Sequence, residues 1–205
     1  MNEGRLTRTP RGVEFAVGAL AAIGIAVTWL SNVLDGPMGV LASGLFLLGF
    51  FTIWVNVAVA VVYLRGVRGG LVRGGVAMMI AVVGLVYHFM LSGIHDPEGP
   101  LAHAGNWITH YIVPAAVMAD WAIFGPRREL RWRWAVIWLA VPLAYTTFAI
   151  MRGLATGFYA YPFLDVSTLG GAGVAREIAV LLVAFTVAGL LVIAVRKLGR
   201  QAARA

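Results

Sequence analysis

Residues 175–195 read AREIAVLLVAFTVAGLLVIAV, and the last 18 of them carry no charged side chain. At about 1.5 Å per residue, a helix of this length crosses the roughly 30 Å hydrocarbon core of a bilayer. Five further stretches of this kind precede it, at 13–34, 40–64, 71–91, 106–124 and 132–151. The sequence therefore predicts an all-α polytopic membrane protein with six transmembrane helices in one bundle.

The composition supports this prediction. Of the 205 residues, 60% are hydrophobic and only 12% are charged, whereas about a quarter of the residues of a soluble domain are charged. The mean hydropathy is +0.86. We expect a single six-helix transmembrane domain over residues 1–205, because the spans leave no room for a soluble domain. Cysteine is absent, which excludes disulfides, thiolate metal sites and cysteine nucleophiles.

The basic residues fall almost entirely on one side of the predicted spans. Fourteen of the 16 lie before span one, between spans two and three, between four and five, or after six, and only Arg152 and Arg176 lie on the other side. The positive-inside rule then places the N- and C-termini in the cytoplasm. The net charge of +7 is thus expected to contact anionic lipid and not nucleic acid. The 14 residues are Arg5, Arg8, Arg11, Arg65, Arg68, Arg73, Arg127, Arg128, Arg131, Arg133, Arg196, Lys197, Arg200 and Arg204.

Several polar side chains lie at membrane depth, where they are costly and often functional. Counted along the helix from the nearest basic anchor, Thr52, His88 and His110 lie 13, 15 and 17 residues away, or about 20, 22 and 25 Å. The three can therefore belong to one site in the outer half of the membrane. Asn56 and Asp120 come out lower, at about 10 to 14 Å, and are predicted to form a second polar layer.

Structural interpretations exist for each of these residues. A threonine in a membrane helix usually bonds its own preceding carbonyl, and a buried histidine often joins two helices. Pro114 leaves the carbonyl of His110 without its helical donor, which predicts a bend and a cavity there. Near the outer rim, Arg152 is expected to face Asp165, Glu177 or an anionic headgroup.

A hydroxyl and an imidazole at one depth are typical of nucleophilic acyl transfer, because the imidazole can take the hydroxyl proton as attack begins. The candidates for orienting the imidazole are His88 and Asn56, and those for stabilising an oxyanion are Asn106 and Tyr145. A site in the outer leaflet would receive its substrate from lipid, which favours a long-chain ester.

Other classes of function fit the same residues. Two histidines on consecutive spans, His88 and His110, could ligate a haem iron and make the protein a redox protein. A non-catalytic lipid-binding scaffold or a transporter also remains open, although the sequence has no internal repeat of the kind found in many transporters.

Three short motifs carry a family resemblance: FFTIWVN at 50–56, HYIVP at 110–114 and GFYAYPFLD at 157–165. In this order and on these spans, they resemble the androgen-induced membrane protein family and its bacterial six-helix relatives. Eukaryotic members of that family are integral membrane threonine hydrolases that split fatty acid esters of hydroxy fatty acids. The resemblance implies that Thr52 is the nucleophile, that His110 is its base, and that the protein lies in a bacterial plasma membrane.

The leading hypothesis is a lipid-ester hydrolase. His110 deprotonates Thr52, an acyl-enzyme forms, and water releases the fatty acid. We expect membrane lipids and a hydrophobic ester as partners, and no metal, cofactor or nucleic acid. The supporting or substrate-binding candidates are Asn56, His88, Asn106, Asp120, Tyr145, Arg152, Tyr161 and Asp165.

Overall fold

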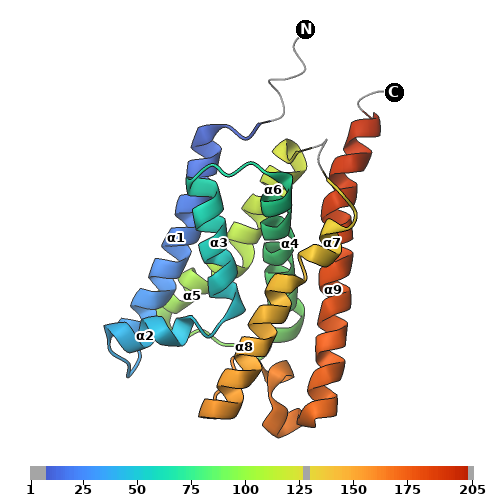
Figure 1. Ribbon diagram of the computed structural model, residues 1–205. Helices are drawn as coiled ribbons and strands as arrows, with labels where there is room; N and C mark the ends of the chain where they lie inside the picture. Colours follow the sequence, from blue (N-terminus) through green and yellow to red (C-terminus); the bar gives the residue numbers. More distant parts are fainter. Residues whose placement is uncertain (1–7, 127–129, 203–205) are drawn as a thin grey trace.

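The computed structural model describes residues 8–126 and 130–202, and over these ranges the protein forms helices and no strands (Figure 1). Five segments are long and apolar enough to cross a membrane. The prediction of an all-α polytopic membrane protein is confirmed. These segments are α1 (Arg11–Leu34); α4 (Gly70–Val86) with η1 (Tyr87–Leu91); α5 (Gly99–Trp107) with η2 (Ile108–Ile112) and α6 (Val113–Phe124); α7 (Trp134–Ile137) with α8 (Ala140–Thr156); and α9 (Val166–Ala202).

The predicted span at 40–64 is not one continuous helix. It consists of α2 (Val40–Leu47) and α3 (Phe51–Leu64), which meet at an angle of 93°. At the break, side chains take the carbonyls that a continuous helix would use: Tyr145 donates its hydroxyl to the Gly49 carbonyl (2.8 Å). Likewise, the Trp54 indole donates to the Leu48 carbonyl (2.7 Å). The bent pair counts as a sixth span only if its two helices are taken together.

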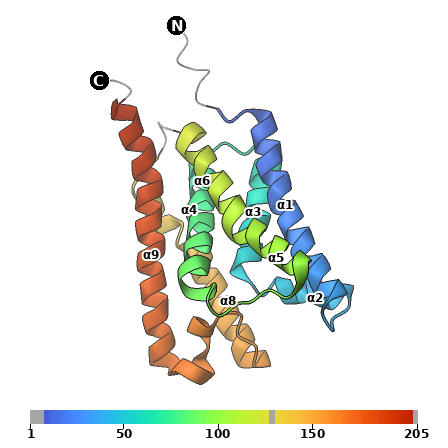
Figure 2. The same ribbon diagram turned by 180° about the vertical axis from the view of Figure 1, so that it is seen from behind.

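Both described ends of the chain lie at the same end of the bundle, where α1 begins and α9 ends (Figures 1 and 2). The connection 65–69 and residues 125–126 and 130–133 also lie there, so we call it the basic end. Arg152 and Arg176 belong to helices at the opposite end, where α8 stops and α9 begins. The described residues thus separate the basic side chains between the two ends as the sequence predicts. Arg5, Arg127, Arg128 and Arg204 lie outside the described residues, as does the side chain of Arg200.

Helix α4 lies at the centre of the bundle and packs against α3, α6 and α9. Its glycines permit close approach of its neighbours: a Cβ at Gly84 would lie 3.1 Å from the His110 carbonyl oxygen and 3.3 Å from the Pro114 ring. On the other side, Gly24 of α1 packs against Thr109 of η2. The segment around His110 is therefore held from two sides.

The chain is π-helical at two facing places, Tyr87–Leu91 and Ile108–Ile112. Pro114 follows the second of these and has no N–H to continue the α-helical hydrogen bonds. A π-helical turn widens the helix and re-aims its side chains, and such turns are frequent at functional sites. Where the sequence predicts a bend and a cavity, the structure has a π-helical turn.

Candidate active site

The hydroxyl of Thr52 lies 3.1 Å from Nε2 of His110. Thr52 is the second residue of α3, next to the break at Gly49, and His110 stands in the π-helical turn before α6. The threonine is buried and the histidine is half-buried. Two residues 58 positions apart in sequence thus form the contact that their similar depth suggested.

The other nitrogen of the imidazole is also in contact. Nδ1 of His110 lies 3.1 Å from the backbone carbonyl of Asn106 and 3.1 Å from the hydroxyl of Thr109. Because the Asn106 carbonyl can only accept, Nδ1 donates to it, and Nε2 is then free to accept the proton of Thr52. The orienting group is therefore a backbone carbonyl, and neither His88 nor Asn56 fills that role.

Tyr87 covers the imidazole. Its ring stacks on that of His110 at a centroid distance of 4.0 Å, and its hydroxyl accepts a hydrogen bond from the Asn106 amide (2.6 Å). Asn106 thus holds the imidazole through its carbonyl and Tyr87 through its side chain, so its amide group is not placed for an oxyanion. His88 is exposed, and its ring contacts Phe89 and Tyr111. This geometry does not favour a haem between His88 and His110.

Asn56 belongs to the same site. Its fully buried amide donates to the carbonyls of Thr52 (2.9 Å) and Thr109 (3.3 Å) and so ties α3 to η2. The predicted second polar layer shared with Asp120 does not form. Within the described residues, the amide oxygens of Asn56 and Asn106 are buried and have no hydrogen-bond partner. Buried acceptors of this kind commonly bind ordered water.

A half-open cavity lies beside the threonine, with about 500 Å³ of empty space when the space at its open mouth is counted. It lies between α3, α4, α8, α9 and the segment that precedes α9, and its wall is almost entirely apolar. Such a wall suits a hydrocarbon chain. The lining residues are Phe51, Thr52, Val82, Val83, Val86, Tyr87, Leu91, Pro142, Tyr145, Thr146, Tyr161, Phe163, Leu164, Leu181 and Phe185.

Two tyrosines that line the cavity, Tyr145 and Tyr161, differ in the hydrogen-bond partners of their hydroxyls. The Tyr145 hydroxyl donates to the Gly49 carbonyl, so its proton is already used. Tyr161 comes from the connection between α8 and α9 and is buried against the start of α3. Burial raises the pKa of Tyr161, and the Thr52 hydroxyl and the backbone N–H groups of Phe51 and Thr52 partly offset this effect. Tyr161 is therefore the phenol next to the threonine.

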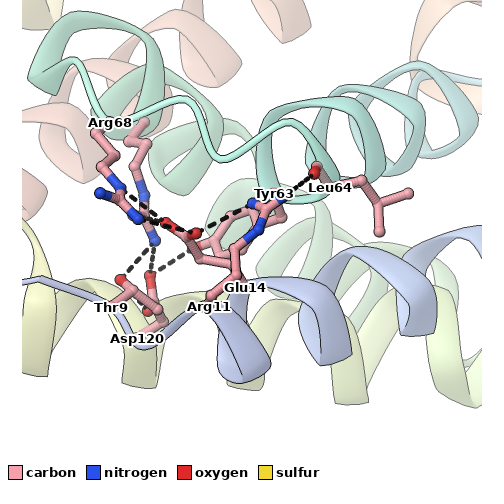
Figure 3. Close-up of polar contacts among 8 residues, drawn as sticks. Thr9, Arg11, Glu14, Tyr63, Leu64, Arg68 and Asp120 are labelled. Atoms are coloured by element: carbon pink, nitrogen blue, oxygen red, sulfur yellow. Dashed lines mark hydrogen bonds and ion pairs between the residues drawn. The ribbon is translucent and has the colours of Figure 1, made fainter.

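Asp120 lies elsewhere, in the second half of α6, among the polar side chains drawn in Figure 3. Its carboxylate accepts hydrogen bonds from Thr9 (2.8 Å), from the Tyr63 hydroxyl (2.7 Å) and from the guanidinium of Arg73. Arg73 also pairs with buried Glu14 (3.5 Å). We call this group the ion-paired cluster; its members are Thr9, Arg11, Glu14, Tyr63, Arg68, Arg73 and Asp120.

Sequence reasoning missed the ion-paired cluster as a unit. The sequence predicts Arg73 as a topology anchor and Asp120 as part of a polar layer, and it does not predict a role for Glu14. The available signal was an acidic residue in each of two apolar spans, one in 13–34 and one in 106–124, with an arginine at a similar depth in a third.

The remaining two candidates, Asp165 and Arg152, lie outside the Thr52–His110 pair. Asp165 caps the start of α9: its carboxylate accepts from the backbone N–H groups of Ser167 (2.8 Å) and Thr168 (3.2 Å). The hydroxyls of these residues lower the pKa of Asp165. Arg152 packs over the ring of Phe158 (4.7 Å) and pairs with neither Asp165 nor Glu177; the latter is bound by Arg176 (3.0 Å).

We found no match to this chain among protein-family models, curated proteins or solved structures. The function of the protein therefore has to be inferred from the residues of the site themselves.

Proposed function

We propose that this protein is an intramembrane hydrolase of lipid esters in which Thr52 is the nucleophile and His110 its general base. The observation that carries the proposal is the 3.1 Å contact between the Thr52 hydroxyl and Nε2 of His110, beside an apolar cavity. A threonine hydroxyl is a weak nucleophile unless a base removes its proton. The resemblance of the three short motifs to the androgen-induced membrane protein family supports the same pair.

In the first step, Oγ1 of Thr52 attacks the ester carbonyl carbon while Nε2 of His110 takes its proton. The bond between Nδ1 and the Asn106 carbonyl (3.1 Å) stabilises the imidazolium that forms. The negative charge on the carbonyl oxygen would meet the Tyr161 hydroxyl and the first N–H groups of α3, which also form the positive end of a helix dipole. His110 then returns the proton to the departing alcohol.

In the second step, a water molecule releases the fatty acid from Thr52. His110 takes a proton from this water as the water oxygen attacks the acyl carbonyl carbon. The bond from that carbon to Oγ1 of Thr52 then breaks, and His110 returns the proton to Oγ1 as the fatty acid leaves. Because the cavity wall is apolar, the water molecule has to be bound by polar groups next to the Thr52–His110 pair. The unpaired amide oxygens of Asn56 and Asn106 are the acceptors available for it. The acyl chain would occupy the cavity and enter from the lipid.

The proposed setting follows from the charges. With the basic end in the cytoplasm, both termini are cytoplasmic and the Thr52–His110 pair lies in the outer half of a bacterial plasma membrane. Membrane lipids and a hydrophobic ester are the partners that this setting provides.

Covalent labelling with a hydroxyl-directed fluorophosphonate tests the nucleophile. Detergent-purified native protein should be labelled on Thr52, and Thr52→Ala and His110→Ala should lose the label, because removing a general base typically costs a factor of about 10² to 10⁴. Thr146→Ala is the matched control, since Thr146 lines the same cavity without contacting His110. Labelling that persists in Thr52→Ala would contradict the assignment of the nucleophile.

A substrate screen with long-chain esters follows the labelling. Turnover by the native protein that is lost with Thr52 would establish hydrolysis. If folded native protein binds a long-chain lipid but neither reacts with the probe nor turns over any ester, the cavity is that of a lipid-binding scaffold and our proposal is wrong.

A further inference from the structure

The cavity beside Thr52 offers few hydrogen-bond partners to water. A buried water molecule typically needs about three such partners, and apolar cavities stay dry. In the cavity wall, the Tyr145 hydroxyl already donates to a backbone carbonyl (2.8 Å), and the Tyr87 hydroxyl accepts from the Asn106 amide (2.6 Å). Two buried amide oxygens lack a partner in the described part of the chain, those of Asn56 and Asn106, but neither residue lines the cavity. Water is therefore scarce where the acyl chain would lie.

The half-buried residues of the cavity wall lie at membrane depth. Val86, Thr146 and Leu181 come from three different segments that are long and apolar enough to cross a membrane. Val86 lies 13 residues from Arg73, and Leu181 lies 15 residues from Arg196, or about 20 and 22 Å along the helices. Both heights fall within a hydrocarbon core of roughly 30 Å. The cavity therefore opens toward lipid, where long-chain molecules are abundant and water is not.

The first step of ester cleavage already requires a place for an alcohol. In that step, His110 returns a proton to the alcohol as it leaves the carbonyl carbon. The reverse of this event is attack by an alcohol on the acyl group of Thr52, with Nε2 of His110, which lies 3.1 Å from the Thr52 hydroxyl, again as the base. A long-chain alcohol also gains free energy by burying its chain against the apolar wall, which water does not. The site thus favours an alcohol over water as the acyl acceptor.

We propose that the protein is also an acyltransferase, and that its apolar cavity directs the acyl group of Thr52 to a long-chain alcohol in the membrane in preference to water. The inference rests on the proposed hydrolase function, because both reactions use the same acyl-enzyme.

The transfer step exchanges one alcohol for another and consumes no water. The hydroxyl oxygen of the second alcohol forms a bond to the acyl carbonyl carbon, while Nε2 of His110 takes the hydroxyl proton. The bond from that carbon to Oγ1 of Thr52 then breaks, and His110 returns the proton to Oγ1. The products are a new ester and the regenerated Thr52 hydroxyl.

The two reactions are compared through their products, with protein in phosphatidylcholine nanodiscs, a lipid that has no hydroxyl of its own. Each long-chain ester of the substrate screen serves as acyl donor, with deuterated hexadecanol added to saturation, and mass spectrometry gives the initial rates of deuterated ester and of fatty acid. The new ester should exceed the fatty acid by about 10-fold, the equivalent of one hydrogen bond that water lacks in the cavity. Thr52→Ala should form neither product. Glycerol in place of hexadecanol should give little new ester, because it has no apolar chain to bury.

Val83→Thr tests the role of the apolar wall. It keeps the size of the side chain and adds a hydroxyl to the wall, one helical turn from Tyr87, whose ring covers His110. The added oxygen can accept a hydrogen bond from water, so the ratio of new ester to fatty acid should fall about 10-fold. This ratio does not depend on the amount of folded protein, because both products come from one acyl-enzyme. Val86→Thr, at the half-buried edge of the wall, is a second variant of the same kind.

Val72→Thr is the matched control. Val72 lies on the same helix, α4, but it is exposed and does not line the cavity, so the ratio should stay at the native value. If Val83→Thr and Val86→Thr give the same ratio as Val72→Thr, the apolar wall does not select the acceptor and the inference is overturned. Equal yields of new ester from glycerol and from hexadecanol overturn it as well.

The products also separate the inference from the proposed function. If the native protein forms at least as much fatty acid as new ester, the inference is overturned and the hydrolase proposal stands. If it forms new ester through Thr52 but no fatty acid, the hydrolase proposal fails and the transfer activity stands. Formation of neither product from any ester contradicts both.

Discussion

The Thr52–His110 pair and the ion-paired cluster both place polar groups between α3 and the helices around it, but their chemistry differs. The cluster contains formal charges that compensate one another: the carboxylates of Glu14 and Asp120, both labelled in Figure 3, each form an ion pair with Arg73. The Thr52–His110 pair has no carboxylate partner, as the imidazole is oriented by the Asn106 carbonyl. The cavity lies beside the pair and not beside the cluster.

This difference separates two uses of buried polarity. The carboxylates of the cluster already accept hydrogen bonds from several donors, and the cluster joins the segment before α1 to α3, α4 and α6 through hydrogen bonds and ion pairs. A neutral imidazole with an accepting nitrogen can take up a proton, which a guanidinium that is already protonated cannot. We therefore expect substitutions in the cluster to change stability and substitutions at the pair to change reactivity.

The largest expected effect on stability comes from Arg73→Met. It leaves buried Asp120 with only the hydroxyls of Thr9 and Tyr63 as partners, and breaking a buried pair in this way typically costs about 3 to 5 kcal/mol. Thermal unfolding in detergent should show the loss, while labelling of Thr52 per folded molecule stays at the native level. Arg176→Met, in an exposed pair, should change the free energy of unfolding by less than about 1 kcal/mol.

The Arg73→Met experiment also tests whether the ion-paired cluster and the Thr52–His110 pair act separately. If Arg73→Met abolishes labelling in protein that is still folded, the ion-paired cluster controls the reactive pair and the two regions are not separate. If Arg73→Met is as stable as Arg176→Met, the charges of the cluster are not buried as the structure has them.

For Gly84→Ala we expect a smaller effect, which concerns the labelling rate of Thr52 and not the stability. The new Cβ would lie 3.1 Å from the His110 carbonyl oxygen, so the π-helical turn has to shift by a few tenths of an ångström. A misplacement of about 1 Å can cost 100-fold in rate, and we expect a loss of about 10-fold in the labelling rate here. The free energy of unfolding should change little, because alanine also favours the helix by about 0.5 to 1 kcal/mol.

Gly171→Ala is the matched control for this variant. Gly171 belongs to α9, where it directly follows the kink at Gly170, and its added Cβ would meet no atom within 4 Å. If both alanine variants keep native labelling rates, the fit of α4 against His110 does not set the geometry of the pair.

The fold was largely predictable because the apolar runs are long enough to span a membrane and because clusters of basic residues lie at their ends on one side. The break at Gly49 was not, since residues 40–64 read as one apolar run. At the break, the Gly49 carbonyl accepts a hydrogen bond from the hydroxyl of Tyr145, a residue of α8 that lies 96 positions away in sequence. A hydrogen bond over such a separation leaves no local pattern to detect.

The candidate site was predictable in part for a similar reason. Counting residues gives the depth of a side chain but not the direction in which it points. Thr52 and His110, which have similar depths, are in contact, whereas His88, at a similar depth, is exposed. Depth also misassigned Asn56, which bonds the carbonyls of Thr52 and Thr109. The group that orients His110 is a backbone carbonyl, and every residue has one, so residue types alone cannot point to it.

The smallest expected effect concerns Asp165, a carboxylate outside both regions. Its bonds to Ser167 and Thr168 lower its pKa in the folded protein, so ionised Asp165 stabilises the start of α9, and Asp165→Ala should lower the melting temperature slightly at neutral pH. Because the folded pKa lies below the ordinary value of 3.8, this difference should persist down to that pH and disappear as the pH falls further. Labelling of Thr52 in Asp165→Ala at neutral pH should be unchanged, because the Asp165 carboxylate bonds only to Ser167 and Thr168 at the start of α9. A loss of labelling at an unchanged melting temperature would instead show that Asp165 contributes to the reactive site.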